Sequence, residues 1–155
     1  KMSAMQAALG LAQLERVDEL VSKKRQLFAW YQEAFQQCGL DRVLSLNETS
    51  KDVEHSYWMV LASLPRNHPL KKEQWMELLK KRGIDTRPCF HPLSSIPAYR
   101  EQAQAKIAAS RNQVSYDIAP RTINLPSALK LNQESVRYVT EALMIVLNQH
   151  KEEVA

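Results

Sequence analysis

Glycine is scarce in this sequence. Only three of the 155 residues are glycines, namely Gly10, Gly39 and Gly83. A loop that holds phosphate with its backbone N–H groups needs several closely spaced glycines, because side chains would keep the anion away from the backbone. We therefore expect no glycine-rich phosphate loop. If this chain contacts a phosphate, it does so in another way.

Cysteine and histidine are also few. The two cysteines, Cys38 and Cys89, lie far apart and form no CxxC pair, so we expect no disulfide framework and a reducing, cytoplasmic compartment. The four histidines are His55, His68, His91 and His150. None of them belongs to a histidine or cysteine pair at the spacing of metal ligands, so we expect no metal site.

Long apolar runs are missing too. No run approaches the roughly 20 residues that a membrane-spanning helix needs, and the first residues do not resemble a secretory signal peptide. The net charge is +4, with basic residues interleaved with glutamates, whereas a nucleic-acid-binding surface gathers its basic residues on one face. We expect a single soluble domain without membrane or nucleic-acid partners. A basic DNA-binding domain is the weaker alternative, and steeply salt-dependent DNA binding would support it.

Hydrophobic periodicity predicts the element order ααβαβααβα. Helical spacing of apolar residues occupies residues 3–37 with a break at 13–16, then 70–82, 99–119 and the segment that follows Asn132. Ser3 with Gln6 fits a capping box, Gly39 is the expected left-handed C-cap of the helical segment 3–37, and Asn132 is the expected cap of the last helix. Runs of β-forming residues predict strands at 56–64, 84–87 and 122–125. The remaining segments, 41–54 and 88–97, predict loops. The expected fold class is α+β, a small and mostly antiparallel three-stranded sheet covered by helices on one face.

The first helix is apolar on more than one side. Its Leu9, Leu11 and Leu14 point in different directions from one another. A helix that is apolar all round must be buried on several sides. We therefore expect another domain or another subunit to cover it.

Lysine is the residue that forms Schiff bases, and it must be partly desolvated to do so. The paired lysines at 23–24, 71–72 and 80–81 lie in helical stretches that we expect to be exposed. The other lysines lie in polar surroundings or begin the chain. We therefore expect no catalytic lysine in this chain.

The segment from Gly83 to Leu93 carries the most distinctive polar residues. Arg87 and His91 lie at the end of a predicted strand that prolines stiffen. Arg87 could bind a phosphate or carboxylate with two parallel N–H donors, and His91 could donate to a hydroxyl or phosphate oxygen. The alternative is structural, with Arg87 paired to an acidic neighbour and His91 capping a loop. The residues alone leave both interpretations open.

Four segments, in order, resemble motifs of the DegT/DnrJ/EryC1/StrS family of PLP-dependent sugar aminotransferases. Residues 1–14 resemble its N-Y-[RK]-M-[ST]-x-x-Q-A-A-x-G-x-x-Q-L run, and residues 83–93 resemble its G-I-x-T-R-P-x-F-x-P-L run. Residues 56–59 and 123–126 resemble its S-x-W-M and N-L-P motifs. The second run is most similar to the perosamine-synthase-like group. Cys89 and His91 depart from positions that are often aromatic, which leaves the exact sugar undetermined.

The resemblance implies the C-terminal small domain of a type I PLP-dependent aminotransferase. Residues 1–155 would form this domain, and residues 1–37 would link it to a large domain that is absent from the chain. That large domain would carry the PLP and the Schiff-base lysine. By this resemblance the chain would contain no cofactor-binding residue, no cofactor would bind it alone, and the chain alone would be inactive.

The resemblance also implies an activity. Family members transfer an amino group, usually from glutamate, to a keto group on a nucleotide-linked sugar, with the substrate site at a homodimer interface. Lys1, Arg87 and His91 are the residues that the resemblance places near the substrate. A non-catalytic regulatory or binding module with the same fold is the alternative.

Overall fold

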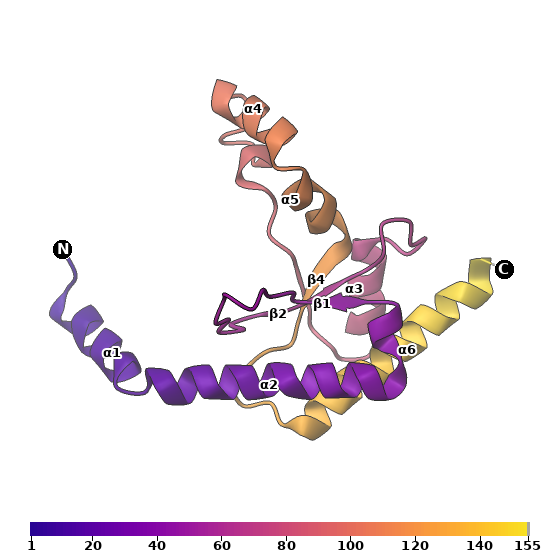
Figure 1. The fold of residues 1–155 in the computed structure, drawn as a ribbon, viewed down its shortest axis with the longest axis horizontal. Helices are drawn as coiled ribbons and strands as arrows, with labels where there is room; N and C mark the ends of the chain where they lie inside the picture. Colours follow the sequence, from indigo (N-terminus) through magenta and orange to yellow (C-terminus); the bar gives the residue numbers. More distant parts are fainter. Residues whose placement is uncertain (155) are drawn as a thin grey trace.

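The computed structural model describes the backbone of residues 1–154 and the side chains of residues 1–149 (Figure 1). The side chain of His150 therefore lies outside the described residues. The helices are α1 (Ala4–Leu14), α2 (Val17–Cys38), α3 (Lys72–Lys80), α4 (Ala103–Arg111), α5 (Gln113–Ile118) and α6 (Gln133–Val154). The strands are β1 (Ser45–Leu46), β2 (Val60–Ser63), β3 (Arg87–Pro88) and β4 (Thr122–Leu125). Three short 3₁₀ turns are η1 (Leu40–Arg42), η2 (Leu93–Ser95) and η3 (Ala119–Arg121).

The sheet is antiparallel throughout, with strand order β1-β2-β4-β3. The α+β class is confirmed, but the described sheet has four strands where the sequence predicts three. The extra strand, β1, lies inside the segment predicted as a loop. It has only two residues, too few for an alternating pattern to be visible, and it exists because Ser45 and Leu46 pair with Ser63 and Ala62 of β2.

The core lies between one face of the sheet and three helices. Val60 and Ala62 of β2 and Ile123 and Leu125 of β4 share this face and are buried. Because side chains alternate along a strand, Leu61 and Asn124 point to the opposite face. Figure 1 shows α2 and α6 crossing beside the sheet, while α4 and α5 extend away from it as an arm. The inward residues of the helices complete the core, among them Phe28, Tyr31, Trp75, Leu79, Val136, Leu143 and Val146.

Predicted helix ends are confirmed where local hydrogen bonds define them. The Ser3 hydroxyl accepts from the Gln6 N–H at 3.3 Å, and the Gln6 side chain accepts from the Ser3 N–H at 2.9 Å, which is a capping box. At the start of α6, Asn132 Oδ1 accepts from the Ser135 N–H at 2.9 Å. The segment predicted as a strand at 84–87 begins differently, because the Ile84 N–H bonds to the Leu79 carbonyl and closes α3.

The helix α1 has no buried residue. It continues beyond the end of α2 and away from the sheet in Figure 1. Its apolar side chains are exposed, including Met5, Leu9 and Leu14. None of the described residues covers the face that the sequence predicts to be covered by another domain or subunit.

The C-cap of α2 yields a stability prediction. Gly39 has φ 74°, in the left-handed region where a Cβ is unfavourable. We expect Gly39→Ala to lower the free energy of unfolding by about 1 kcal/mol, measured by urea denaturation. Gly10→Ala is the control, because Gly10 lies inside α1 and a Cβ there meets no atom within 4 Å. That variant should be as stable as the wild type or slightly more so, and equal losses in both would contradict the assignment.

Candidate functional site

Arg87 begins β3 on the sheet face that points away from the core. It lies directly opposite Asn124 of β4. Its Nη2 donates to Asp85 Oδ2 at 3.2 Å, and both side chains are largely exposed, Arg87 at 78% and Asp85 at 73%. Pairing with an acidic neighbour, the structural alternative, is therefore present. An exposed ion pair of this kind contributes little, so the guanidinium remains available to an anionic ligand.

Asn124 connects β3 to the centre of the sheet through its side chain. Its Nδ2 donates to the Pro88 carbonyl at 3.0 Å. Its Oδ1 is buried and has no hydrogen-bond partner among the described residues. Since a buried acceptor is normally satisfied, this oxygen is a position where a water or ligand donor would be stabilising. It lies on the same face as Arg87.

The three predicted substrate residues lie in different places. His91 is exposed and lines a cavity of about 750 Å³ beside η3, hereafter the η3 cavity. Arg87 lines a smaller hollow of about 350 Å³ between α3 and β3. Lys1 lies at the free end of α1, outside both. This chain therefore does not bring Lys1, Arg87 and His91 together into one site.

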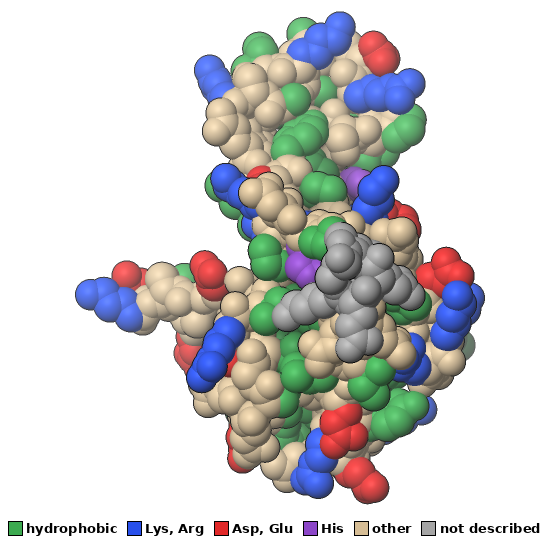
Figure 2. All heavy atoms as spheres, turned by 90° about the vertical axis from the view of Figure 1, so that its right-hand side faces the viewer, with side chains coloured by type: hydrophobic (Ala, Val, Ile, Leu, Met, Phe, Trp, Pro, Cys, Tyr) green, Lys and Arg blue, Asp and Glu red, His purple; other side chains and the backbone are tan. Residues whose placement is uncertain are grey.

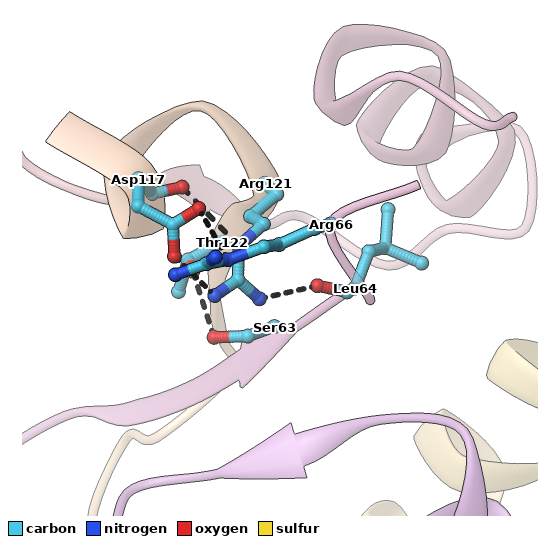
Figure 3. Close-up of polar contacts among 6 residues, drawn as sticks. All are labelled: Ser63, Leu64, Arg66, Asp117, Arg121 and Thr122. Carbon is cyan, nitrogen blue, oxygen red and sulfur yellow. Dashed lines mark hydrogen bonds and ion pairs between the residues drawn. The ribbon is translucent and has the colours of Figure 1, made fainter. Parts of the chain in front are cut away.

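An arginine–aspartate cluster forms one side of the η3 cavity (Figure 3). Asp117 Oδ1 accepts from Arg66 Nε at 3.0 Å, and its Oδ2 accepts from Arg121 Nη2 at 2.8 Å. Arg121 also donates to the carbonyl oxygens of Asp117 and Leu64. The Leu64 N–H in turn donates to the Arg121 carbonyl at 2.9 Å. Arg121 thus joins the end of β2 to the start of β4.

The cluster lowers the pKa of Asp117 below its ordinary value of 3.8. The hydrogen bond from Arg121 is the main cause; partial burial opposes it, and the charges of Arg121 and Arg66 add to it. A carboxylate with a lowered folded-state pKa stabilises the fold above its unfolded pKa, and this contribution is lost as the pH falls through the lowered value.

Thermal unfolding at several pH values tests this linkage. We expect Asp117→Asn to unfold at a lower temperature than the wild type at neutral pH. The difference should shrink below about pH 3.8 and vanish at lower pH. Asp41→Asn is the control, because the exposed Asp41 carboxylate forms no ion pair within the described part of the chain. A gap that stayed constant down to low pH would contradict the linkage.

Two lysines are less exposed than the sequence predicts. Lys72, the first residue of α3, is only 5% exposed and donates from Nζ to the Ala119 carbonyl at 3.0 Å. Lys24 of α2 is half-buried and donates to the carbonyls of Trp58 and Ser127, and burial lowers its pKa. The prediction of exposed helical stretches was wrong at both positions. The segments that cover these lysines come from distant parts of the chain, which helical periodicity does not reveal.

An exposed aromatic pair lies beside β2 and β3. The rings of Trp58 and Phe90 are stacked with centroids 6.3 Å apart, and both side chains are more than half exposed. The preceding residue, Tyr57, has φ 49° and stacks on Phe28 at 3.7 Å. The left-handed backbone at Tyr57 is unfavourable for a bulky residue, so this packing holds the turn that carries Trp58.

The cluster residues Arg66, Asp117 and Arg121 were not predicted from the sequence. Asp117 and Arg121 are four residues apart, the spacing at which opposite charges meet on a helix, and this signal was available. Arg66 had no such signal, because it meets Asp117 only through folding. On the face in Figure 2, basic and acidic side chains are interspersed.

The described residues form neither a membrane-spanning helix nor a metal-binding cluster. No helix among them combines the length and apolar character that crossing a membrane requires. No group of three or more histidine, cysteine, aspartate or glutamate side chains in that part of the chain is arranged to hold a metal ion.

Comparison with protein families matches residues 1–144 to the DegT/DnrJ/EryC1/StrS aminotransferase family. The chain belongs to this family. The GDP-perosamine synthase of Escherichia coli O157:H7 is 34% identical over 143 residues, which are 92% of this chain and 36% of that protein. The resemblance of the four sequence segments is therefore confirmed, including its perosamine-synthase-like character. The chain spans little more than a third of the length of this relative.

Solved structures show the same fold. The PLP form of Spr1654 from Streptococcus pneumoniae superposes with a TM-score of 0.79 at 22% identity, covering 96% of this chain and 36% of that one. DesI, solved in the presence of its TDP-sugar product, gives a TM-score of 0.77 at 19% identity, with 96% and 36% covered. At such identities the likeness concerns the fold alone.

The family depends on PLP, but the η3 cavity does not fit this cofactor. A PLP site needs a lysine amine that reaches the cofactor and a carboxylate that pairs with its ring nitrogen. Here the Lys72 amine bonds to a backbone carbonyl, and both Asp117 oxygens are occupied by Arg66 and Arg121. The donor set suits an anion better than a pyridine ring.

Proposed function

We propose that residues 1–155 form the C-terminal small domain of a PLP-dependent aminotransferase. The longer protein would transfer an amino group from glutamate to the keto group of a nucleotide-linked sugar. The match of residues 1–144 to the DegT/DnrJ/EryC1/StrS aminotransferase family carries this proposal. The similarity to a GDP-perosamine synthase supports a nucleotide-linked substrate.

Amino transfer and substrate binding would involve different parts of the longer protein. PLP, when bound in the large domain, would supply the electron sink for amino transfer. Arg87 would bind a negatively charged group of the substrate, and His91 and Lys1 would contact it from their own segments. Because these three residues lie apart here, the site would be completed by the large domain and by a second subunit of a cytoplasmic homodimer. The uncovered apolar face of α1 supports such a contact.

The activity can be measured directly on the longer protein. It would be incubated with glutamate and with GDP-, TDP- and UDP-linked keto sugars, and formation of 2-oxoglutarate and of the amino sugar would be followed. We expect turnover with at least one sugar nucleotide and none with residues 1–155 alone. A PLP-aldimine absorbance on the short chain, reducible by borohydride onto one lysine, would overturn the assignment of the chemistry to the large domain. Sugar-nucleotide binding without turnover by the longer protein would favour a non-catalytic module.

Arg87 provides a test of the substrate assignment. In the longer protein we expect Arg87→Ala to raise the KM for the sugar nucleotide about tenfold, since a charge-assisted contact contributes roughly 1.5 kcal/mol. The KM for glutamate should not change. Arg100→Ala is a matched control, because Arg100 is also exposed and paired with an acidic neighbour, Glu101. Equal effects of the two variants would contradict a substrate role for Arg87.

A further inference from the structure

The η3 cavity carries an excess of positive charge. Its lining includes four basic side chains and only two carboxylates: Arg66, Lys71, Lys72 and Arg121 against Glu73 and Asp117. Counted over these six side chains, the net charge is +2 around a cavity of about 750 Å³. The carboxylate of Asp117 is shared between two arginines, as Figure 3 shows, so it does not neutralise the other cations.

Lys72 is the most unusual of these cations. It is 5% exposed, and its Nζ has a single hydrogen-bond acceptor among the described residues, the Ala119 carbonyl at 3.0 Å. An ammonium group has three donors, and no carboxylate in the described part of the chain forms an ion pair with this one. Burying a charge without a counter-charge is costly. Lys72 also begins α3, where the helix dipole disfavours a cation.

We propose that the η3 cavity is a binding site for a phosphate-type oxyanion, with Lys72 as its buried cation. A dianion would match the net charge of +2. It would give the Lys72 ammonium the acceptors and the counter-charge that the fold does not provide. Arg66 and Arg121 also line the cavity, and each guanidinium has more N–H donors than the hydrogen bonds that it makes here. Lys71, an exposed residue, lines the cavity as well. The cavity has room for more than a single phosphate group.

Two sources could supply this anion. One is free inorganic phosphate, and the other is the diphosphate of a nucleotide. His91 lines the cavity and is also a proposed substrate contact, but the cations that would hold the anion, Lys72, Arg66 and Arg121, have no role in the proposed amino transfer. The anion site therefore does not depend on that activity. A protein without this site could still transfer amino groups, and a non-catalytic module could still bind phosphate here. The two proposals therefore fail separately.

Titration of ¹⁵N-labelled residues 1–155 with sodium phosphate, and separately with GDP, tests the proposal. Sodium chloride at matched ionic strength is the reference. We expect saturable chemical-shift changes in residues 66–72 and 117–121 with phosphate or GDP, and none with chloride. Binding of GDP at least tenfold tighter than phosphate would identify a nucleotide diphosphate as the ligand, whereas equal or weaker binding would identify free phosphate. The absence of saturable changes in these segments with both ligands would overturn the proposal.

Variants of two lysines at opposite ends of α3 distinguish a specific role of the buried Lys72 ammonium from a general effect of positive charge on anion binding. We expect Lys72→Met to weaken phosphate-type binding at least tenfold and Lys72→Arg to keep it within about threefold. Lys80→Met is the control, because Lys80 ends the same helix, is exposed and does not line the cavity. Circular dichroism would establish that each variant is folded. If Lys72→Met does not fold, two other results test the proposal. The wild type must show saturable shifts in residues 66–72 and 117–121, and Lys72→Arg must bind within about threefold of the wild type. Wild-type affinity in a folded Lys72→Met variant would contradict the role of Lys72.

Discussion

Replacing Trp75 with alanine is expected to lower the free energy of unfolding by about 3–5 kcal/mol. Trp75 is fully buried on α3, within the core that joins α3 to the sheet and α6. Its Nε1 has no hydrogen-bond partner among the described residues, so the loss comes from packing and from the cavity that the indole leaves. Guanidinium denaturation followed by circular dichroism would measure it. Trp75→Phe should recover a large part of the stability.

Trp58→Ala is the matched control for this prediction. Trp58 is 59% exposed, and its ring stacks on that of Phe90. Removing a largely exposed side chain leaves no closed cavity, so we expect a loss below about 1 kcal/mol. If Trp58→Ala were as destabilising as Trp75→Ala, the placement of the two tryptophans would be wrong.

Arg121→Ala should have the second largest effect, a loss of about 2–3 kcal/mol. The guanidinium donates to the backbone carbonyls of Leu64 and Asp117 as well as to the Asp117 carboxylate. Leu64 is buried, so its carbonyl would lose a charged donor in a place that water reaches poorly. Urea denaturation at neutral pH and moderate salt would measure the change.

Comparison with Arg66→Ala distinguishes the stability that Arg121 gains from its backbone contacts from the stability of an ion pair with Asp117. Arg66 binds the same carboxylate, but its side chain is 75% exposed, compared with 24% for Arg121. An exposed ion pair contributes up to about 1 kcal/mol, so the loss should be small and should decrease in high salt. Equal losses in the two variants would show that the carboxylate contact, and not the link between β2 and β4, provides the stability.

Local patterns of the sequence were sufficient for much of the fold. The capping box of Ser3 and Gln6, the cap at Asn132 and the left-handed Gly39 were all predicted correctly. Each depends on hydrogen bonds or backbone angles within a few residues of one another. The buried stripe of α6 was predicted for the same reason, since residues such as Val136 and Leu143 repeat at the helical period.

The arrangement of the candidate site was much less predictable. The sequence identified Arg87 and His91 as neighbours in one stiffened segment, and the structure places them at two different cavities. A spacing of four residues around a strand end does not determine which side each side chain faces, because the direction depends on how β3 pairs with β4. The η3 cavity was not predicted at all, because its walls come from residues 64–73, 91–95 and 116–121.

The sequence by itself determined the absence of a glycine-rich phosphate loop, the α+β class and the aminotransferase family. Composition is a count over the chain, and periodicity and motifs depend on residues that are close in sequence, so none of them requires the tertiary structure. The burial of Lys72 was decided only by the tertiary structure. Its ammonium contacts a carbonyl 47 positions further along the chain. No local pattern marks such a contact, since it forms only when the sheet and the helices have brought the two segments together. The charge that makes the η3 cavity a candidate anion site is therefore a product of folding.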